Sequence, residues 1–476
     1  MKIYNTLTRK VEQFKPLTDK EVCVYNCGPT VYDYMHIGNL RKFVFDDTLR
    51  RTLEANAYNV KQTMNITDVG HLVSDDDEGE DKLEKGAHRE GKTVWQVAET
   101  YIQSFKDDMR AINALEPNTH SGDEVYSRAT KFVPQQIKMI EILLNKGFAY
   151  QTKQAIYFDV NKLASYGELT GQKLTDKEIG VRKDVVTDKN KHHPQDFAVW
   201  FFTVERFAHH DMHWDSPWGE GFPGWHLECS AIIHAILGDP IDIHTGGVDN
   251  IGTHHVNEMA QTEAAFGHKL ANYWVHSEHL LVGGHRMAKS AGNFYTLNDV
   301  VKRGFEALSL RLLFLQSHYR TQMNFSWENL ESAQNRLRSW RNTSELIWQA
   351  PGQNIYVLEF DQAAEKVKKF MADDLNSPLA LAEVSQTMSL VETNLLATGK
   401  EDAFLGYLKT LDKLFGLDLS HVKDISASQK QAIAEREQAR HLKDWPKSDK
   451  IRKKLESQGI SLRDTAHGAV WFRIYS

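Results

Sequence analysis

Hydrophobic and polar positions in the first part of the chain follow two successive periods. Residues 21–27, EVCVYNC, alternate in polarity as a half-buried β-strand does. A Gly-Pro pair then breaks the strand, and residues 36–58 carry apolar side chains at helical spacing. Residues 61–69, KQTMNITDV, predict a second strand. Strand, helix and strand in this order predict a parallel, doubly wound sheet, which binds ligands at the carboxyl ends of its strands.

A second block of the same kind begins near residue 222. It predicts helix, strand, helix and strand over residues 225–237, 241–247, 257–266 and 273–282. Before it, residues 94–146 have a helical pattern and residues 150–211 are mixed and polar. We therefore expect the middle of the chain to be an insertion between two halves of one sheet.

Beyond residue 308 the apolar period is almost wholly helical, which predicts a helical bundle. The last 56 residues, from His421, hold 12 Lys and Arg against 7 Asp and Glu, a surplus of +5 in a chain of net charge −7. A basic end of this kind is consistent with contact to phosphates, although solvated helix faces are often lysine-rich without a ligand. The fold class expected is α/β, with a Rossmann-like parallel sheet, an inserted domain, a helical bundle and a small C-terminal mixed α/β unit. The corresponding segments are 1–115, 116–221, 222–300, 301–420 and 421–476.

Composition narrows the class of protein further. At 476 residues, with 41% hydrophobic and 25% charged residues, the chain is expected to fold as several ordinary globular domains. It has no apolar stretch of the ~20 residues that a membrane span needs, and its start is too polar for a secretory signal, so we expect a cytoplasmic protein without a membrane partner. The acidic run at 74–81, SDDDEGED, is expected to be a solvated loop of unassigned role.

The three cysteines, an odd and sparse set, indicate reduced thiols, metal ligands or core residues and not a disulfide framework. Cys27 follows the first strand and Cys229 falls in a predicted helix. His254 and Glu258 are four residues apart, so on a helix they share one face. Two thiolates, an imidazole and a carboxylate suit tetrahedral zinc. On spacing alone, a surface His–Glu pair and two buried cysteines explain the same residues.

Two short motifs can handle phosphates. HIGN, residues 36–39, lies where the first strand gives way to a helix, whose start carries unpaired N–H groups and partial positive charge. His36 and Asn39 can donate hydrogen bonds there, and Gly38 permits close approach of a base. Further on, LLVGGHRMAKSAGNF places Arg286 and Lys289 on a glycine-flanked loop that can close on a triphosphate. Either motif alone is often a chance match.

Together the motifs resemble those of the cysteinyl-tRNA synthetases, a family of class I aminoacyl-tRNA synthetases. HIGN is similar to the HIGH signature of the class and RMAKS to its KMSKS signature. The resemblance extends over residues ~20 to ~471 through longer strings, namely CGPTVYDYMHIGN, MNITDVGHL, SPWGEGFPGWHLECSA, DIHTGGVDN, HHVNEMAQTEA and KDWPKSDKIRKKLESQGISLRDTAHGAVW.

The resemblance implies a function and a set of residues. A member joins L-cysteine to tRNA(Cys) at the expense of ATP and Mg²⁺, with one zinc ion on the substrate thiol. The family's ATP-binding residues correspond to His36, Asn39 and Lys289, within motifs that also contain Gly38 and Arg286. Its zinc ligands correspond to Cys27, Cys229, His254 and Glu258, its cysteine pocket to Thr67, Trp225 and Asp249, and its anticodon-reading residues to Arg440, Trp445, Asp449 and Asp464. A monomer is the family default.

Three positions depart from the class signatures. Asn39 stands for the last His of HIGH, Arg286 for the first Lys of KMSKS, and Ala288 for its Ser, which removes a hydroxyl. Two other functions therefore stay open. One is a ligase that passes activated cysteine to an aminosugar, which has no use for the bundle and basic end. The other is a weakly catalytic paralogue that binds cysteine or tRNA for sensing. Because zinc separates thiol from hydroxyl, and the insertion has only ~100 residues, no editing domain is expected.

Overall fold

The computed structural model describes residues 1–70, 72, 81–120, 122, 124–171, 188–350 and 359–474. The chain forms two compact units, Met1–Val300 with Tyr319–Asn324 and Val301–His318 with Phe325–Ser476. No helix in the described part is long and apolar enough to cross a membrane. Most of the acidic run lies outside the described residues, but its last member, Asp81, is buried and caps a helix, so that residue is not part of a solvated loop.

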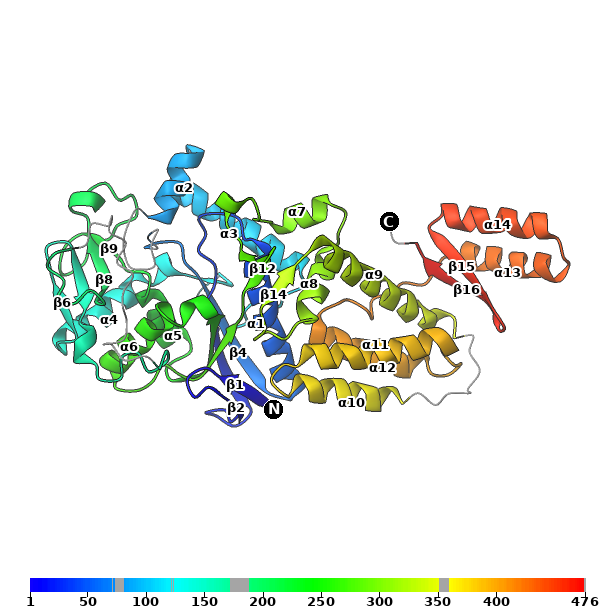
Figure 1. The fold of residues 1–476 in the computed structure, drawn as a ribbon, viewed down its shortest axis with the longest axis horizontal. Helices are drawn as coiled ribbons and strands as arrows, with labels where there is room; N and C mark the ends of the chain where they lie inside the picture. Colours follow the sequence, from blue (N-terminus) through cyan, green and yellow to red (C-terminus); the bar gives the residue numbers. More distant parts are fainter. Residues whose placement is uncertain are drawn as a thin grey trace. The chain divides into compact units, whose positions relative to one another are not determined.

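The first unit is built on a five-stranded parallel sheet, which confirms the doubly wound prediction (Figure 1). The strand order is β11-β10-β3-β4-β5. The chain moves from β3 outward to β4 and β5, and later returns to the other side of β3 with β10. The switch point therefore lies between β3 and β10, where such sheets bind ligands. The strands are β3 (Glu21–Asn26), β4 (Asn59–Ile66), β5 (Ser127–Arg128), β10 (Ile241–Gly247) and β11 (Ala271–Ser277).

Helices lie along this sheet close to where the sequence predicts them. Three of them confirm predicted helices: α1 (Ile37–Ala55), α5 (Leu227–Ile236) and α6 (His254–Phe266). The helical pattern over 94–146 corresponds to two helices, α3 (Val94–Ala111) and α4 (Val133–Asn145), with a non-helical break between them. The break is held to the sheet, since Asn118 N donates to Gln62 O of β4 and Arg50 donates to Glu116 O. The short helices α2 (Lys82–Glu90) and α7 (Leu297–Lys302) complete this set.

The inserted segment contains an antiparallel sheet of order β6-β7-β8-β9 that the sequence did not predict. Every residue of β8 is buried, so it lacks the alternation that marks a half-exposed strand. Its side chains share a core with Leu227 and Ala231 of α5 and Ala260 of α6, and Figure 1 shows α4, α5 and α6 beside this sheet. The strands are β6 (Ala149–Gln151), β7 (Ala155–Phe158), β8 (Phe197–Phe202) and β9 (Gly221–Pro223).

The second unit contains the predicted helical bundle and C-terminal α/β unit. In the latter, a small core of Ile425, Leu455, Leu462 and Trp471 joins two helices to a hairpin. The helices are α8 (Ala307–Leu315), α9 (Trp327–Ser344), α10 (Phe360–Met371), α11 (Ser377–Asn394), α12 (Glu401–Phe415), α13 (Ala427–His441) and α14 (Trp445–Ser457), and the hairpin is β15 (Ile460–Thr465) and β16 (Gly468–Arg473). Short strands elsewhere are β1 (Lys2–Asn5), β2 (Lys10–Gln13), β12 (Leu280–Val282), β13 (His285–Arg286) and β14 (Met323–Phe325). The five-segment division itself stays a prediction.

Candidate active site

A cleft of about 1130 Å³ opens at the carboxyl ends of β3, β4 and β10 in the first unit. It brings together both predicted phosphate motifs and the predicted amino-acid pocket, although these come from segments more than 200 residues apart. Its lining includes Cys27, His36, Gly38, Asn39, Thr67, Trp225, Asp249, His254, Arg286 and Lys289. Cys229 and Glu258 are fully buried and lie outside this lining.

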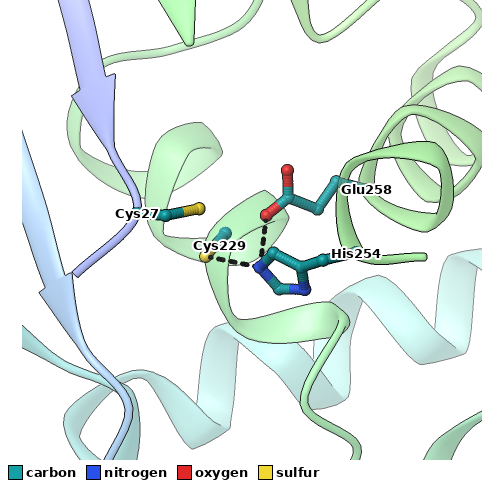
Figure 2. Close-up of side chains that lie close together, drawn as sticks. All are labelled: Cys27, Cys229, His254 and Glu258. Atoms are coloured by element: carbon teal, nitrogen blue, oxygen red, sulfur yellow. Dashed lines mark hydrogen bonds and ion pairs between the residues drawn. The ribbon is translucent and has the colours of Figure 1, made fainter. Parts of the chain in front are cut away.

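The four predicted metal ligands meet at one point. One donor atom from each of Cys27, Cys229, His254 and Glu258 lies within 4.8 Å of the others. Figure 2 shows the four side chains close together. Cys27 follows β3, Cys229 lies on α5, and His254 and Glu258 lie one turn apart on α6. Two sulfur atoms, one nitrogen and one oxygen form a donor set that suits zinc. The fold therefore unites residues whose spacing alone favoured a surface pair and two buried cysteines.

The contacts inside this group are those of ligands aimed at a shared centre. His254 Nε2 lies 2.9 Å from Glu258 Oε1 and 3.5 Å from Cys229 Sγ. Both carboxylate oxygens of Glu258 are buried, and each faces an imidazole nitrogen, His254 Nε2 at 2.9 Å and His244 Nε2 at 2.8 Å. A buried carboxylate beside two buried thiols is costly once the thiols lose their protons, because like charges then lie close together away from water. A cation among the four side chains offsets that cost, so the residues fit a zinc ion.

Neighbouring residues hold the ligands in orientation. The Trp225 ring stacks on His254 with centroids 4.3 Å apart and an interplanar angle of 10°, and His226 Nδ1 lies 3.1 Å from His254 Nδ1. These contacts direct His254 Nε2 toward the sulfur atoms, as outer partners of metal-bound histidines do. Burial opposes charge on Glu258, but His244 and His254 outweigh it and hold the pKa of this carboxyl well below its ordinary value.

A second layer of histidines lies behind the four ligands. His244 Nε2 lies 2.8 Å from Glu258 Oε2, and His255 Nε2 lies 3.3 Å from Cys27 Sγ. His255 in turn contacts His276 at 2.8 Å. His255 is completely buried. Since it adjoins His254 in sequence, the pattern THHVNE is the only signal that could have indicated it.

The residues expected to bind the amino acid lie on the cleft wall beside the four ligands. Thr67 follows β4, Trp225 precedes α5, and Asp249 lies just after β10. Asp249 Oδ1 is 3.1 Å from both His279 Nε2 and Arg286 Nη1, and its side chain is 54% exposed. It is thus an accessible carboxylate in a cleft, the group that an ammonium requires.

HIGN forms the start of α1, with His36 at the N-cap. Asn39 N donates to His36 Nδ1 at 3.1 Å, and His36 N donates to Asn39 Oδ1 at 3.2 Å, a reciprocal capping box. The backbone N–H of Asn39 is therefore paired, whereas the sequence led us to expect unpaired backbone N–H groups along this turn. Burial lowers the pKa of His36 to about 4, so the ring is neutral at pH 7. Because Nδ1 accepts, the proton of the neutral ring sits on Nε2, which is then a hydrogen-bond donor.

Gly38 packs closely against both phosphate motifs. A Cβ there would lie 2.6 Å from Met287 Cε and 2.9 Å from the His36 ring. Met287 belongs to the RMAKS segment, so a larger residue at position 38 would make the Met287 side chain or the His36 ring shift. Close packing of the two motifs therefore favours glycine here, in addition to any approach of a base.

The RMAKS loop is tied to the body of the first unit. Lys289 Nζ forms a short ion pair with Asp33 and lies 5.1 Å from the Phe294 ring centroid. Where the class signature has a serine hydroxyl, Ala288 N donates to Asn293 Oδ1 at 2.9 Å, and Asn293 Nδ2 donates to Arg286 O at 3.1 Å. Asn293 thus supplies a bridge across the loop despite the missing hydroxyl.

Comparison with known proteins decides the family. A model of the "tRNA synthetases class I (C) catalytic domain" matches residues 13–335. The cysteine--tRNA ligase of Treponema denticola is 39% identical over 500 residues, covering 100% of both chains. Cysteine--tRNA ligase 1 of Burkholderia lata is 42% identical over 475 residues, covering 98% of this chain and 95% of that one. The chain belongs to the cysteine–tRNA ligase family.

Membership makes the chain an aminoacyl-tRNA synthetase of class I, as the motifs predict. Its fold is similar to that of Mycobacterium tuberculosis methionyl-tRNA synthetase in complex with methionyl-adenylate, with a TM-score of 0.59 at 12% identity, covering 84% of this chain and 92% of that one. The leucyl enzyme of Agrobacterium radiobacter K84, solved as a ternary complex, matches with a TM-score of 0.59 at 12% identity, covering 86% of each chain. At such low identity these likenesses concern the fold, and they confirm the Rossmann-like α/β class.

The synthetase residues expected to read the anticodon lie in the second unit. Trp445 is 52% exposed at the start of α14, and the Arg440 guanidinium lies 5.8 Å from its ring centroid. Asp449 is exposed on α14. Asp464 is bound by Arg436 at 2.7 and 2.9 Å and by Arg440 at 3.2 Å. Asp464 therefore braces the arginines, and the anticodon role of all four stays a prediction.

The sequence also left two acidic residues of the cleft unassigned. Glu228, beside Cys229, accepts hydrogen bonds from Asn65 and Thr67, and burial raises its pKa to about 8. Asp33 contacts both Lys289 and Arg89. The strings WHLECS and VYDYM contain these residues, but nothing in their spacing distinguishes them from solvated or structural acids.

Proposed function

We propose that this chain activates L-cysteine with ATP and transfers it to the 3′ end of tRNA(Cys), with one zinc ion on Cys27, Cys229, His254 and Glu258. The observation that carries the proposal is the convergence of four buried potential metal ligands, of which Cys27 and His254 line the cleft that holds HIGN and RMAKS. A thiol-binding centre and a triphosphate-binding centre in one cleft match the chemistry of cysteine activation.

Cys27, Cys229, His254 and Glu258 would hold the zinc ion, which would supply a Lewis acid that lowers the pKa of the substrate thiol. Asp249 receives the ammonium, and Trp225 closes the pocket while holding His254 in place. Serine has a harder and far less acidic hydroxyl, and a plain pocket separates such near-isosteres only ~10²-fold. The metal-binding residues thus select cysteine before activation, which makes an editing site unnecessary.

Activation is an in-line displacement governed by position and charge. The cysteine carboxylate attacks the α-phosphorus, an O–P bond forms, the α–β bridge breaks, and pyrophosphate leaves. His36 Nε2 and Asn39 Nδ2 donate to the phosphate oxygens. Lys289 leaves Asp33 to meet the charge that develops on them, with Mg²⁺ accompanying ATP. In the second step a ribose hydroxyl of the terminal adenosine attacks the carbonyl carbon, the ester forms and AMP leaves.

Transfer of radiolabelled cysteine to tRNA(Cys) tests this proposal. We expect charging together with cysteine-dependent ATP–pyrophosphate exchange. Exchange without charging favours the aminosugar ligase, and absence of both favours the sensing paralogue. We place the reaction in the cytoplasm and in a monomer.

The metal part has its own test with a matched control. Cys229→Ser is expected to lower exchange at least 100-fold and to release zinc. Cys23→Ser, which changes the half-buried cysteine that lies outside the ligand group, is expected to retain both. Unchanged exchange in Cys229→Ser contradicts zinc recognition of the thiol.

A further inference from the structure

One wall of the cleft is more basic than ATP binding requires. Helix α2 presents Lys82, Lys85, Gly86 and Arg89 to it, at positions i, i+3, i+4 and i+7 of one helix face. The motifs HIGN and RMAKS, on other elements, already supply donors and a cation for a triphosphate. The positive charges on α2 therefore suit a polyanion other than the triphosphate of ATP.

The helix is fixed with this face toward the cleft. Asp81 caps its N-terminus, accepting from Leu83 N at 2.7 Å, and Asp81 is itself contacted at 3.5 Å by the buried His210 of the inserted segment. On the cleft side, Gly86 packs so closely that a Cβ would lie 3.3 Å from Tyr32 O. These contacts of α2 thus fix which face of the helix, and therefore which lysines, are turned toward the cleft.

The cationic side chains of α2 differ in how many partners they contact within the protein. Arg89 contacts Asp33 at 3.4 Å and Glu90 at 3.1 Å, and Lys82 Nζ lies 5.7 Å from the Tyr32 ring centroid. Lys85 is exposed, and its side-chain ammonium forms no hydrogen bond or ion pair with any residue in the described ranges. Lys85 is therefore the cation most available to a ligand.

An exposed aromatic ring adjoins this basic face. Tyr34 lines the same cleft and is 50% exposed, although it directly precedes the buried Met35. Its ring packs edge-on against Tyr101 with centroids 4.9 Å apart, and Arg89 donates to the Tyr101 hydroxyl at 3.2 Å. The Tyr34 ring is thus held from one side and open on the other. The base of ATP is expected beside Gly38 of HIGN, so the open face of Tyr34 is left for stacking by another, unpaired base.

Cations along one helix face beside an open aromatic ring are the signature of a single-stranded nucleic-acid site. We propose that Lys82, Lys85 and Arg89 bind phosphates of the unpaired 3′ strand of tRNA and that Tyr34 stacks on one of its bases, guiding the terminal adenosine to the adenylate. This inference rests on the proposed function, because it names the residues that receive the nucleic acid at that same cleft.

The experiment compares two steps in the full-length chain. Adenylate formation is measured by exchange without tRNA, and transfer is measured in a single turnover from preformed adenylate. We expect Lys85→Gln to lower kcat/KM for tRNA about 3- to 10-fold and Tyr34→Ala about 10-fold, with Tyr34→Phe restoring transfer. We expect exchange to change less than twofold. Each lost phosphate contact also reduces the slope of log rate against log salt by about 0.7.

Lys10→Gln is the matched control, since Lys10 is an exposed cation on β2 outside the cleft lining. It is expected to leave transfer and its salt dependence unchanged. A parallel fall of exchange and transfer in Lys85→Gln would assign α2 to ATP and overturn the inference, as would unchanged transfer in both Lys85→Gln and Tyr34→Ala. If the unsubstituted chain charges no tRNA, the proposed function itself fails, which is a distinguishable result.

Discussion

His36 and Asn39 hold each other at the first turn of α1, each backbone N–H donating to the other side chain at 3.1–3.2 Å. This pairing explains how asparagine serves where the class signature has histidine. Its Oδ1 completes the capping box, while its Nδ2 is left to donate toward the cleft. The same pairing fixes the proton of His36 on Nε2.

Substitution of Asn39 separates these two roles. Asn39→Asp keeps the capping acceptor but replaces the donor with a negative charge near the phosphates. We expect it to retain thermal stability and to lower exchange at least 100-fold. Asn39→Ala loses both, so we expect a stability loss of about 1 kcal/mol in addition to lower exchange. Equal exchange in Asn39→Asp and the unsubstituted chain would remove Asn39 from phosphate binding.

The pKa of His36 gives a pH dependence with a definite sign. Burial lowers it from 6.5 to about 4, so the folded chain binds this proton more weakly than the unfolded chain. The stability contributed by neutral His36 is fully present above pH 6.5 and is lost as the pH falls from 6.5 through 4. The comparison is with His36→Asn, which keeps a capping side chain. The difference in free energy of unfolding between the unsubstituted chain and this variant, measured from denaturation curves, should be constant at pH 7–8. Below pH 6.5 it should shift against the unsubstituted chain by up to about 1.4 kcal/mol per pH unit. Parallel pH profiles of the two chains would show that His36 is not buried in its neutral form.

Asp249 should bind the substrate ammonium. We expect Asp249→Asn to raise the KM for cysteine at least 10-fold and to leave the KM for ATP within about threefold. The ion pair of Asp249 with Arg286 joins side chains that are 54% and 70% exposed, so it is worth little in water. Arg286→Ala should therefore shift the KM for cysteine less than about fivefold. The reverse order of these effects in initial-rate measurements would contradict the assignment.

Local patterns predicted much of the fold, whereas contacts between distant segments were beyond them. The strands at Glu21–Asn26 and Ile241–Gly247 and the helix Ile37–Ala55 follow from periodicity and Gly-Pro punctuation. The β8 strand was missed because all six of its residues are buried, which removes alternation. Histidine is not a favoured N-cap residue, so the capping box was not foreseen either.

For the site, too, residue identities could be predicted from the sequence, whereas contacts between distant segments could not. Each of the four candidate metal ligands could be named through family resemblance, but Cys27 and Cys229 lie close together only because the second half of the sheet returns beside the first. The Lys289–Asp33 pair spans 256 positions, and no spacing rule relates such residues. The histidines behind the metal ligands come from β10, α6 and β11, and likewise converge only in the fold.

Trp445 offers a test of the second unit. Its exposed ring beside Arg440 is suited to stacking on a base. We expect Trp445→Ala to lower kcat/KM for tRNA charging about 10- to 100-fold and to leave exchange unchanged. Trp445→Phe, which keeps an aromatic surface, should recover most of the loss. Charging unaffected by Trp445→Ala would exclude this ring from the tRNA interface.

The central claim, that a metal on Cys27, Cys229, His254 and Glu258 takes the substrate thiol, has a direct spectroscopic test. Cobalt(II) is substituted for zinc, and the sulfur-to-cobalt charge-transfer absorption is recorded as cysteine is added without ATP. We predict that this absorption rises on saturation with cysteine, as a third sulfur joins the two protein thiolates, and stays constant with serine. A spectrum unchanged by cysteine, in a chain that still activates cysteine, would contradict the account.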